Sequence, residues 1–165
     1  MIDINNLLIY ESTFLELKGD RPEKSSTYLK TIVAFSNATQ LSYMVFGIDD
    51  KKKNPTGIDI ETLQKRVMQE IENQVIPRVI PTYEIQQYKG KEILVVQIKP
   101  GLQTPYRLKS NHKVYVRNGE SSIEATASEI NDLVLRGKNV TLDQLPTQYK
   151  IDDIRFDLYK EKYYE

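Results

Sequence analysis

The segment Tyr10-Glu-Ser-Thr-Phe-Leu-Glu-Leu-Lys18 combines an alternating apolar pattern with three charged side chains. Its two leucines alternate with Glu16 and Lys18, which is the period of a strand with one buried and one wet face. Glu16 and Lys18 would therefore project from the same face, and a second carboxylate, Glu11, lies shortly upstream. Two carboxylates beside an ammonium group suit a metal or phosphate site, and they also suit a solvent-exposed strand edge.

Three further strands with a clear pattern are predicted downstream of this segment, while Thr82–Gln87 alternates more weakly and Pro105–Leu108 indicates a short extended piece. The near-continuous apolar run Tyr43–Ile48 indicates a strand that is buried on both faces. It ends at Asp49 and Asp50, which would lie at the end of that strand. Glu92–Ile98 carries the strongest strand pattern in the chain, and Val114–Arg117 predicts another strand before an Asn-Gly turn.

Three helices are predicted from apolar residues at helical spacing. The first begins after Ser25 or Ser26, and the second is capped by Asp59. The third is capped by Ser128 and ends before Gly137, which we expect just past its last turn.

The composition narrows the classes of function. A chain of 165 residues fits one ordinary domain with or without a tail. Without cysteine it has no disulfide framework, thiolate zinc site or cysteine nucleophile, which fits a reducing cytoplasm. The single histidine, His112, excludes a two-histidine metal site. No apolar run approaches the roughly 20 residues of a membrane helix, and no signal peptide is evident, so we expect a cytoplasmic protein without a membrane partner.

The acids Glu11, Glu16, Asp49 and Asp50 form the first group of candidate catalytic residues, together with Lys18. Carboxylate oxygens bind Mg²⁺ or Mn²⁺, and a nearby lysine can stabilise charge on a phosphodiester. We therefore consider Glu11, Glu16 and Asp49 as candidate metal ligands of a nuclease. Acids at strand ends are also common as solvated turn residues, so the spacing leaves both interpretations open.

A second group alternates bases with aromatic residues. The 23 basic and 23 acidic residues balance, so nucleic-acid binding would need a local basic patch rather than a bulk positive charge. Bases interleaved with aromatics suit a phosphate track with stacking positions, and a hairpin with a polar outer face is the alternative. No phosphate-binding Gly-Lys-Ser/Thr loop or GxGxxG motif is present, so we expect no ATP site in this chain. The candidate nucleic-acid-binding residues are Arg107, Lys109, His112, Lys113, Tyr115 and Arg117.

Four short motifs follow one another in a recognisable order. They are the ES and LELK pair within Glu11–Lys18, AFSN at Ala34–Asn37, FGIDD at Phe46–Asp50 and YVRNG at Tyr115–Gly119. In this order they resemble the Schlafen AlbA-like domain over residues 10–135. The resemblance implies an α+β fold, a mixed β-sheet flanked by helices. With the elements predicted above, we expect about five to six strands and three helices.

The resemblance also implies nucleic-acid binding, above all DNA binding, in the N-terminal module of bacterial transcriptional regulators or ATP-dependent helicase-related proteins. In the eukaryotic Schlafen branch, the same domain type is an endoribonuclease. Its carboxylates would correspond here to Glu11, Glu16 and either Asp49 or Asp50, and Lys18 also fits. The chain departs from the family pattern at residues 37–42, where a glycine pair is missing.

Two parts of the chain are distinguished by their composition. Residues 1–137 carry the domain, and residues 138–165 read as a polar linker with a tyrosine-rich end, leading into a further C-terminal region. A nucleic-acid-binding module is the first functional hypothesis, a metal-dependent nuclease the second, and a protein-interaction domain the third. Whether copies of the chain form a homo-oligomer stays open.

Overall fold

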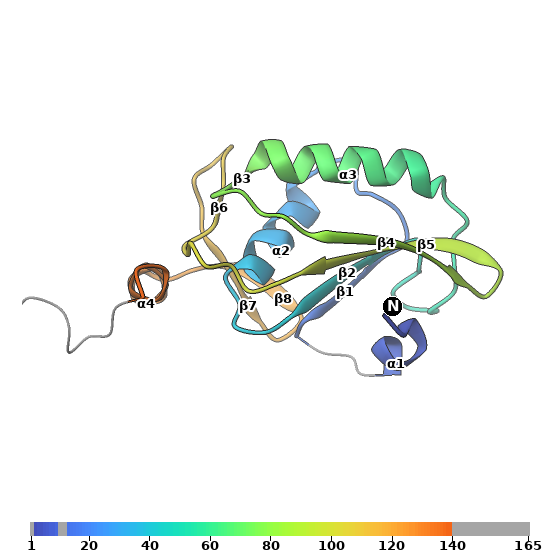
Figure 1. Ribbon diagram of the computed structural model, residues 1–165, viewed down its shortest axis with the longest axis horizontal. Coiled ribbons are helices and arrows are strands. Elements are labelled where there is room, and N and C mark those ends of the chain that lie inside the picture. Colours follow the sequence, from blue (N-terminus) through green and yellow to red (C-terminus); the bar gives the residue numbers. More distant parts are fainter. Residues whose placement is uncertain (1, 10–12, 140–165) are drawn as a thin grey trace, which may run out of the picture.

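A mixed four-stranded sheet forms the centre of the computed structural model, which describes residues 2–9 and 13–139. The strand order is β1-β2-β5-β4 (Figure 1). β1 and β2 run parallel, and the other two neighbouring pairs are antiparallel. The strands are β1 (Leu15–Lys18), β2 (Ser42–Phe46), β4 (Thr82–Tyr88) and β5 (Lys91–Ile98).

The burial of the sheet follows the sequence pattern. β2 and β5 lie in the middle, so their apolar runs are covered on both faces, as predicted. β1 lies at the edge of the sheet, and its two leucines are buried while Glu16 and Lys18 are partly exposed. The alternation predicted for β1 is therefore confirmed.

Helices cover the two faces of the sheet. α2 (Ser26–Ser36) and α3 (Ile60–Gln74) share one apolar cluster with β2 and β5. The short helix α1 (Ile4–Ile9) packs in a second cluster with the opposite face, on the far side of the sheet from α3 (Figure 1). Because α2 connects β1 to β2, these two strands can run parallel.

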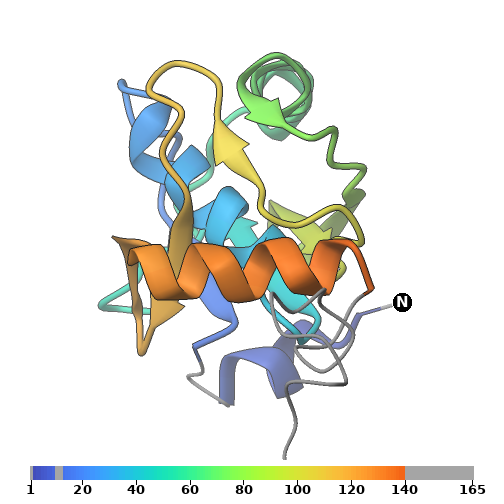
Figure 2. The same cartoon turned by 90° about the vertical axis from the view of Figure 1, so that its left-hand side faces the viewer.

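Two small antiparallel sheets complete the fold. They consist of β3 (Val75–Ile76) with β6 (Arg107–Leu108), and of β7 (Tyr115–Asn118) with β8 (Ser121–Glu124). The last described helix is α4 (Ala127–Gly137), which crosses one end of the molecule (Figure 2).

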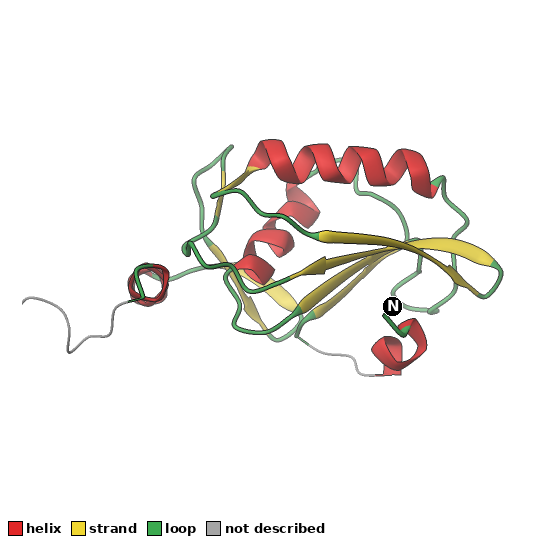
Figure 3. Ribbon diagram, viewed as in Figure 1, coloured by secondary structure: helices red, strands yellow, loops and turns green. Residues whose placement is uncertain are grey.

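The α+β class is confirmed, and the distribution of the strands differs from the prediction. Helices, strands and loops mix along the whole described chain (Figure 3). The main sheet has four strands rather than five to six, because the short strands pair among themselves in the two small sheets. α1 adds a fourth helix to the three that were predicted.

The helix caps correct one of the predictions. Asp59 caps α3 as predicted, since its carboxylate accepts a hydrogen bond from the Thr62 amide at 3.2 Å. α4 is capped by Thr126 instead of Ser128, because Thr126 forms a reciprocal capping box with Glu129.

Gly137 is the last residue of α4 and does not lie past its end. A Cβ atom at this position would lie 2.0 Å from the Thr104 carbonyl oxygen. The Thr104 hydroxyl in turn donates to the Leu133 carbonyl at 2.6 Å. The glycine therefore serves the close approach of α4 to this loop.

A buried asparagine joins α2 to the two small sheets. Asn37 follows α2 and is 3% exposed. Its Nδ2 donates to the carbonyls of Tyr106 and Tyr115, each at 3.0 Å, and its Oδ1 accepts from the Tyr106 amide at 2.7 Å. One side-chain amide thus satisfies three backbone groups, two of Tyr106 and one of Tyr115.

The predicted linker and tyrosine-rich segment, residues 138–165, lies outside the described residues except for its first two positions. Among the helices that the structure describes, none has the length and apolar character needed to cross a membrane.

Candidate functional site

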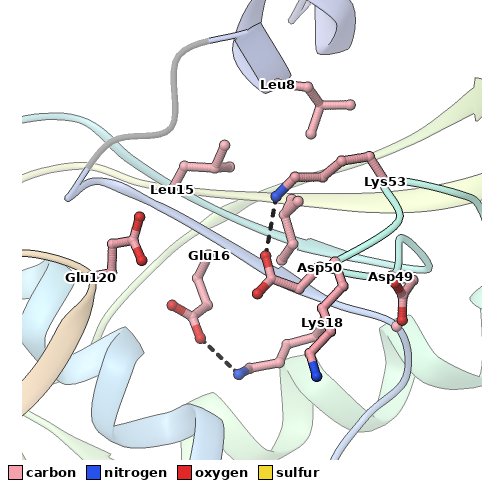
Figure 4. Close-up of a pocket in the computed structure, with 11 residues that line it drawn as sticks. Leu8, Leu15, Glu16, Lys18, Asp49, Asp50, Lys53 and Glu120 are labelled. Atoms are coloured by element: carbon pink, nitrogen blue, oxygen red, sulfur yellow. Dashed lines mark hydrogen bonds and ion pairs between the residues drawn. The ribbon is translucent and has the colours of Figure 1, made fainter.

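A cavity of ≈ 550 Å³ opens along the outer edge of β1, and we call it the β1 cavity. Its apolar wall includes leucines of α1 and β1. The charged side chains come from β1, from the loop after β2 and from the β7–β8 turn, and they surround the same space (Figure 4). The charged lining residues are Glu16, Lys18, Asp49, Asp50, Lys51, Lys53 and Glu120.

Glu16 lies between two cations. Its Oε1 is 2.7 Å from Lys18 Nζ, and its Oε2 is 3.5 Å from Arg117 Nη1. Strand alternation places Glu16 and Lys18 on one face of β1, which explains their direct contact. The charges of these three groups sum to +1.

Arg117, which the sequence predicts as a contact to nucleic-acid phosphate, has a buried side chain in this structure. Its side chain is 3% exposed, with the guanidinium group 5.1 Å from the centre of the Phe35 ring. Nε donates to the Thr13 carbonyl at 2.8 Å, and Nη1 donates to Ser122 Oγ at 3.0 Å. Burial lowers the pKa of Arg117, and the Glu16 carboxylate opposes that shift.

The two aspartates after β2 organise their own loop. Asp49 Oδ1 accepts a hydrogen bond from the Lys52 amide at 2.7 Å. Asp50 is 72% exposed and pairs with Lys53 at 3.2 Å. In Figure 4, Lys53 points towards Asp50, while Glu16 turns towards Lys18.

The structure does not by itself assemble a metal site from the predicted ligands. Within residues 2–9 and 13–139, no three acidic or histidine side chains are close enough together to hold a metal ion. Glu16 and Asp49 line one cavity, but each already has a partner there. Glu11 lies outside the described residues, so its part in a three-carboxylate site stays a prediction.

Most of the predicted basic residues lie on a different part of the surface, which we call the basic turn (residues 107–113). Within it, Leu108 is buried, and the His112 amide donates to the Leu108 carbonyl at 2.9 Å. Arg107, Lys109 and His112 are exposed. None of the residues of the basic turn lines the β1 cavity.

The remaining members of the basic group have partners. Lys113 is exposed and pairs with Glu124 at 2.8 Å. The Tyr115 ring packs against the core, and its hydroxyl accepts from Asn111 Nδ2 at 3.1 Å. Tyr115 is therefore a partly buried residue, and its ring is not a free stacking platform.

Sequence reasoning missed Glu120 as a residue of the site. It follows the Asn-Gly turn between β7 and β8, and this hairpin returns to the edge of β1. The turn signal was readable in the sequence, but the direction in which the hairpin folds back was not.

Three comparisons relate this chain to known protein families, curated proteins and solved structures. The family model described as Schlafen, AlbA_2 matches residues 11–126. A comparison with curated proteins gives no match.

Two solved structures are similar in fold. One is the N-terminal domain of a RecG-related protein from Nitrosomonas europaea, a presumed ATP-dependent DNA helicase, determined by solution NMR. It has a TM-score of 0.55 and 22% identity, covering 75% of this chain and 90% of that one. The crystal structure of the DIP2311 protein from Corynebacterium diphtheriae has a TM-score of 0.56 and 15% identity. That alignment covers 90% of this chain, which spans only 33% of the DIP2311 chain.

The family match and the described fold agree with each other. The matched range begins at the ES motif, includes the whole four-stranded sheet and ends at the cap of α4. The chain therefore belongs to the Schlafen AlbA_2 family.

Proposed function

We propose that this chain binds nucleic acid, with the basic turn as a contact to the phosphate backbone. The observation that carries the proposal is the state of Arg107 and Lys109. Both side chains are exposed, and neither forms an ion pair with any acid in the described part of the chain. Two unpaired cations on one short turn provide the local basic patch that a chain with no net charge needs.

Two further observations support this function. The chain belongs to the Schlafen AlbA_2 family, and a protein of similar fold is the N-terminal domain of a presumed DNA helicase. On this proposal, the chain acts as the nucleic-acid-binding module of a larger bacterial protein. We further propose that this larger protein is a transcriptional regulator. His112 and Lys113 extend the same contact surface.

Fluorescence anisotropy with labelled single-stranded RNA, single-stranded DNA and duplex DNA tests the proposal. The double variant Arg107→Gln/Lys109→Gln should bind more weakly at low salt, because two phosphate contacts are lost. The matched control is Lys65→Gln/Arg66→Gln, which removes the same two residue types from the exposed face of α3. The proposal fails if the wild-type chain binds none of the probes at about 50 mM salt, or if both double variants bind equally well.

A metal-dependent nuclease is the second candidate function. It is favoured by one observation, namely that Glu16, Lys18, Asp49 and Asp50 line a single cavity. Glu11 would be the further ligand for Mg²⁺ or Mn²⁺. The described side chains alone form no metal site, so a bound metal ion would depend on this further ligand.

Cleavage of labelled RNA and single-stranded DNA, with and without Mn²⁺, tests this second function. The Glu16→Gln variant should lose Mn²⁺-dependent cleavage. Glu92→Gln, which removes an exposed carboxylate from β5, is the matched control and should cleave like the wild type. Equal cleavage by wild type and Glu16→Gln would remove the nuclease hypothesis.

A further inference from the structure

Arg117 is a buried cation that lies outside the basic turn, in β7. Of its polar atoms, Nη2 is buried and has no hydrogen-bond partner among the residues that the structure describes. Burial of a guanidinium group removes its hydration, which is unfavourable unless the surroundings compensate. Arg117 reaches the β1 cavity through Glu16, and its other contacts show what the guanidinium group holds in place.

The contacts of Arg117 connect three parts of the molecule. Nε binds the Thr13 carbonyl, which precedes β1, at 2.8 Å. Nη1 binds Ser122 of β8 at 3.0 Å, and Ser122 Oγ donates to Thr31 of α2 at 3.0 Å. Arg117 therefore ties the start of β1 to the β7–β8 hairpin and to α2.

The same guanidinium group also faces the cavity carboxylate. Nη1 is 3.5 Å from Glu16 Oε2, while Glu16 Oε1 is held by Lys18 at 2.7 Å. A carboxylate with one cation on each oxygen has little freedom to rotate. Glu16, Lys18 and Arg117 together carry +1, but the remaining lining adds three acids and two lysines, so any attraction for an anion is local to the Lys18 ammonium group.

We propose that Arg117 is a positioning residue of the β1 cavity. It fixes Glu16 and, through that carboxylate, holds the Lys18 ammonium group where a phosphate group entering the cavity meets it. The inference rests on the proposed nucleic-acid function, because it takes a backbone phosphate as the occupant. Arg117 itself does not touch the phosphate.

NMR of the lysine ammonium groups tests the positioning step without any nucleic acid. In the wild type, the Lys18 ammonium signal should differ from those of exposed lysines because Glu16 restrains it. Arg117→Gln should move this signal to the exposed-lysine position, and Arg117→Lys should restore it in part, since it keeps the charge but not the planar fork. Lys113→Gln is the control, because it removes an exposed cation next to β7 that does not line the cavity.

A double-mutant cycle tests whether Arg117 acts through Lys18. Arg117→Gln and Lys18→Gln should each weaken oligonucleotide binding by about tenfold, the size of one hydrogen bond to a charged group. The double variant should be no weaker than either single variant. A merely structural role would give additive losses, which would overturn the proposal.

The outcomes distinguish a failure of the positioning role of Arg117 from a failure of the proposed nucleic-acid binding. If the wild type binds no oligonucleotide, the proposed function fails, while the Lys18 signal still decides whether Arg117 positions it. An unchanged Lys18 signal in Arg117→Gln overturns the inference, and so does full binding by Lys18→Gln. If Arg117→Gln does not fold, Ser122→Ala removes one Arg117 partner and should shift the Lys18 signal in the same direction by a smaller amount.

Discussion

Removing one hydroxyl group from Tyr28 should destabilise the protein in a pH-dependent way. Tyr28 lies in α2 and is 0% exposed, and its hydroxyl donates to Glu70 Oε2 of α3. Arg21 Nε donates to both oxygens of the same carboxylate, at 3.0 and 3.1 Å. Glu70 therefore connects a loop and two helices through charge-assisted hydrogen bonds.

The Tyr28→Phe variant isolates this hydrogen bond from the packing of the ring. The Tyr28 ring meets Phe46 edge-on, with 5.5 Å between the ring centres, and phenylalanine keeps that contact. Only the donor to Glu70 is lost. A hydrogen bond to a charged group contributes about 1.5–3 kcal/mol, so we expect the free energy of unfolding to fall by that amount at pH 7.

The pH dependence follows from the state of Glu70. Burial alone would raise the pKa of Glu70, but hydrogen bonds from Arg21 and Tyr28 outweigh it and hold the pKa below its ordinary value of 4.5. A lowered pKa in the folded state gives stability that is fully present above the unfolded pKa. This stability is lost as the pH falls through the folded pKa. The difference between wild type and Tyr28→Phe should therefore be full at neutral pH and shrink in acid.

Urea unfolding followed by circular dichroism at neutral and acidic pH measures this difference. Tyr83→Phe is the control. Tyr83 is also affected by burial, which raises the pKa of its phenol to about 12. In the described part of the chain, however, its hydroxyl forms no hydrogen bond that the substitution could remove. The control should change stability by less than about 0.5 kcal/mol. A Tyr28→Phe deficit that is equally small, or that does not shrink in acid, would refute the reasoning.

Three further outcomes are expected from the fold and the basic turn. Gly137→Ala should destabilise the protein by about 1–3 kcal/mol in thermal or urea unfolding, because the added methyl group would lie 2.0 Å from the Thr104 carbonyl oxygen. The control Asn131→Ala, on the exposed side of α4, should not destabilise it. Thr126→Ala should cost about 1 kcal/mol in the same assay, since it removes the capping box of α4. Arg107→Gln/Lys109→Gln should reduce the slope of log affinity against log salt by about 1.4–1.8, and an unchanged slope would mean that these two cations touch no phosphate.

The sequence predicted best those helices and strands that can be recognised from their own residues, without knowledge of what packs against them. Asp59 is followed directly by apolar residues at helical spacing, so the start of α3 was readable from the sequence. The apolar runs of β2 and β5 were equally clear, because strands buried on both faces need no polar positions. Thr126 was missed because Ser128, two residues later, is an equally good capping residue in isolation.

The candidate site could be predicted only in part, because its geometry depends on long-range contacts. Glu16 and Lys18 are two positions apart on one strand, so their pairing followed from alternation. Arg117 is 101 positions away from Glu16, and its sequence context is an alternating strand that gave it a surface position. Only the way in which the β7–β8 hairpin folds against α2 and β1 turns that side chain inward.

Deamidation of Asn37 during storage would directly disturb the fold, because its side-chain amide holds separate segments together. Hydrolysis of that amide would exchange a nitrogen that donates to the Tyr106 and Tyr115 carbonyls for a carboxylate oxygen. Two attractive contacts would then become repulsive, with only the Tyr106 amide left as a donor. Because Asn37 is 3% exposed, the folded state shields it from water. Deamidation at Asn37 should therefore report on how often α2 and the two small sheets separate during storage.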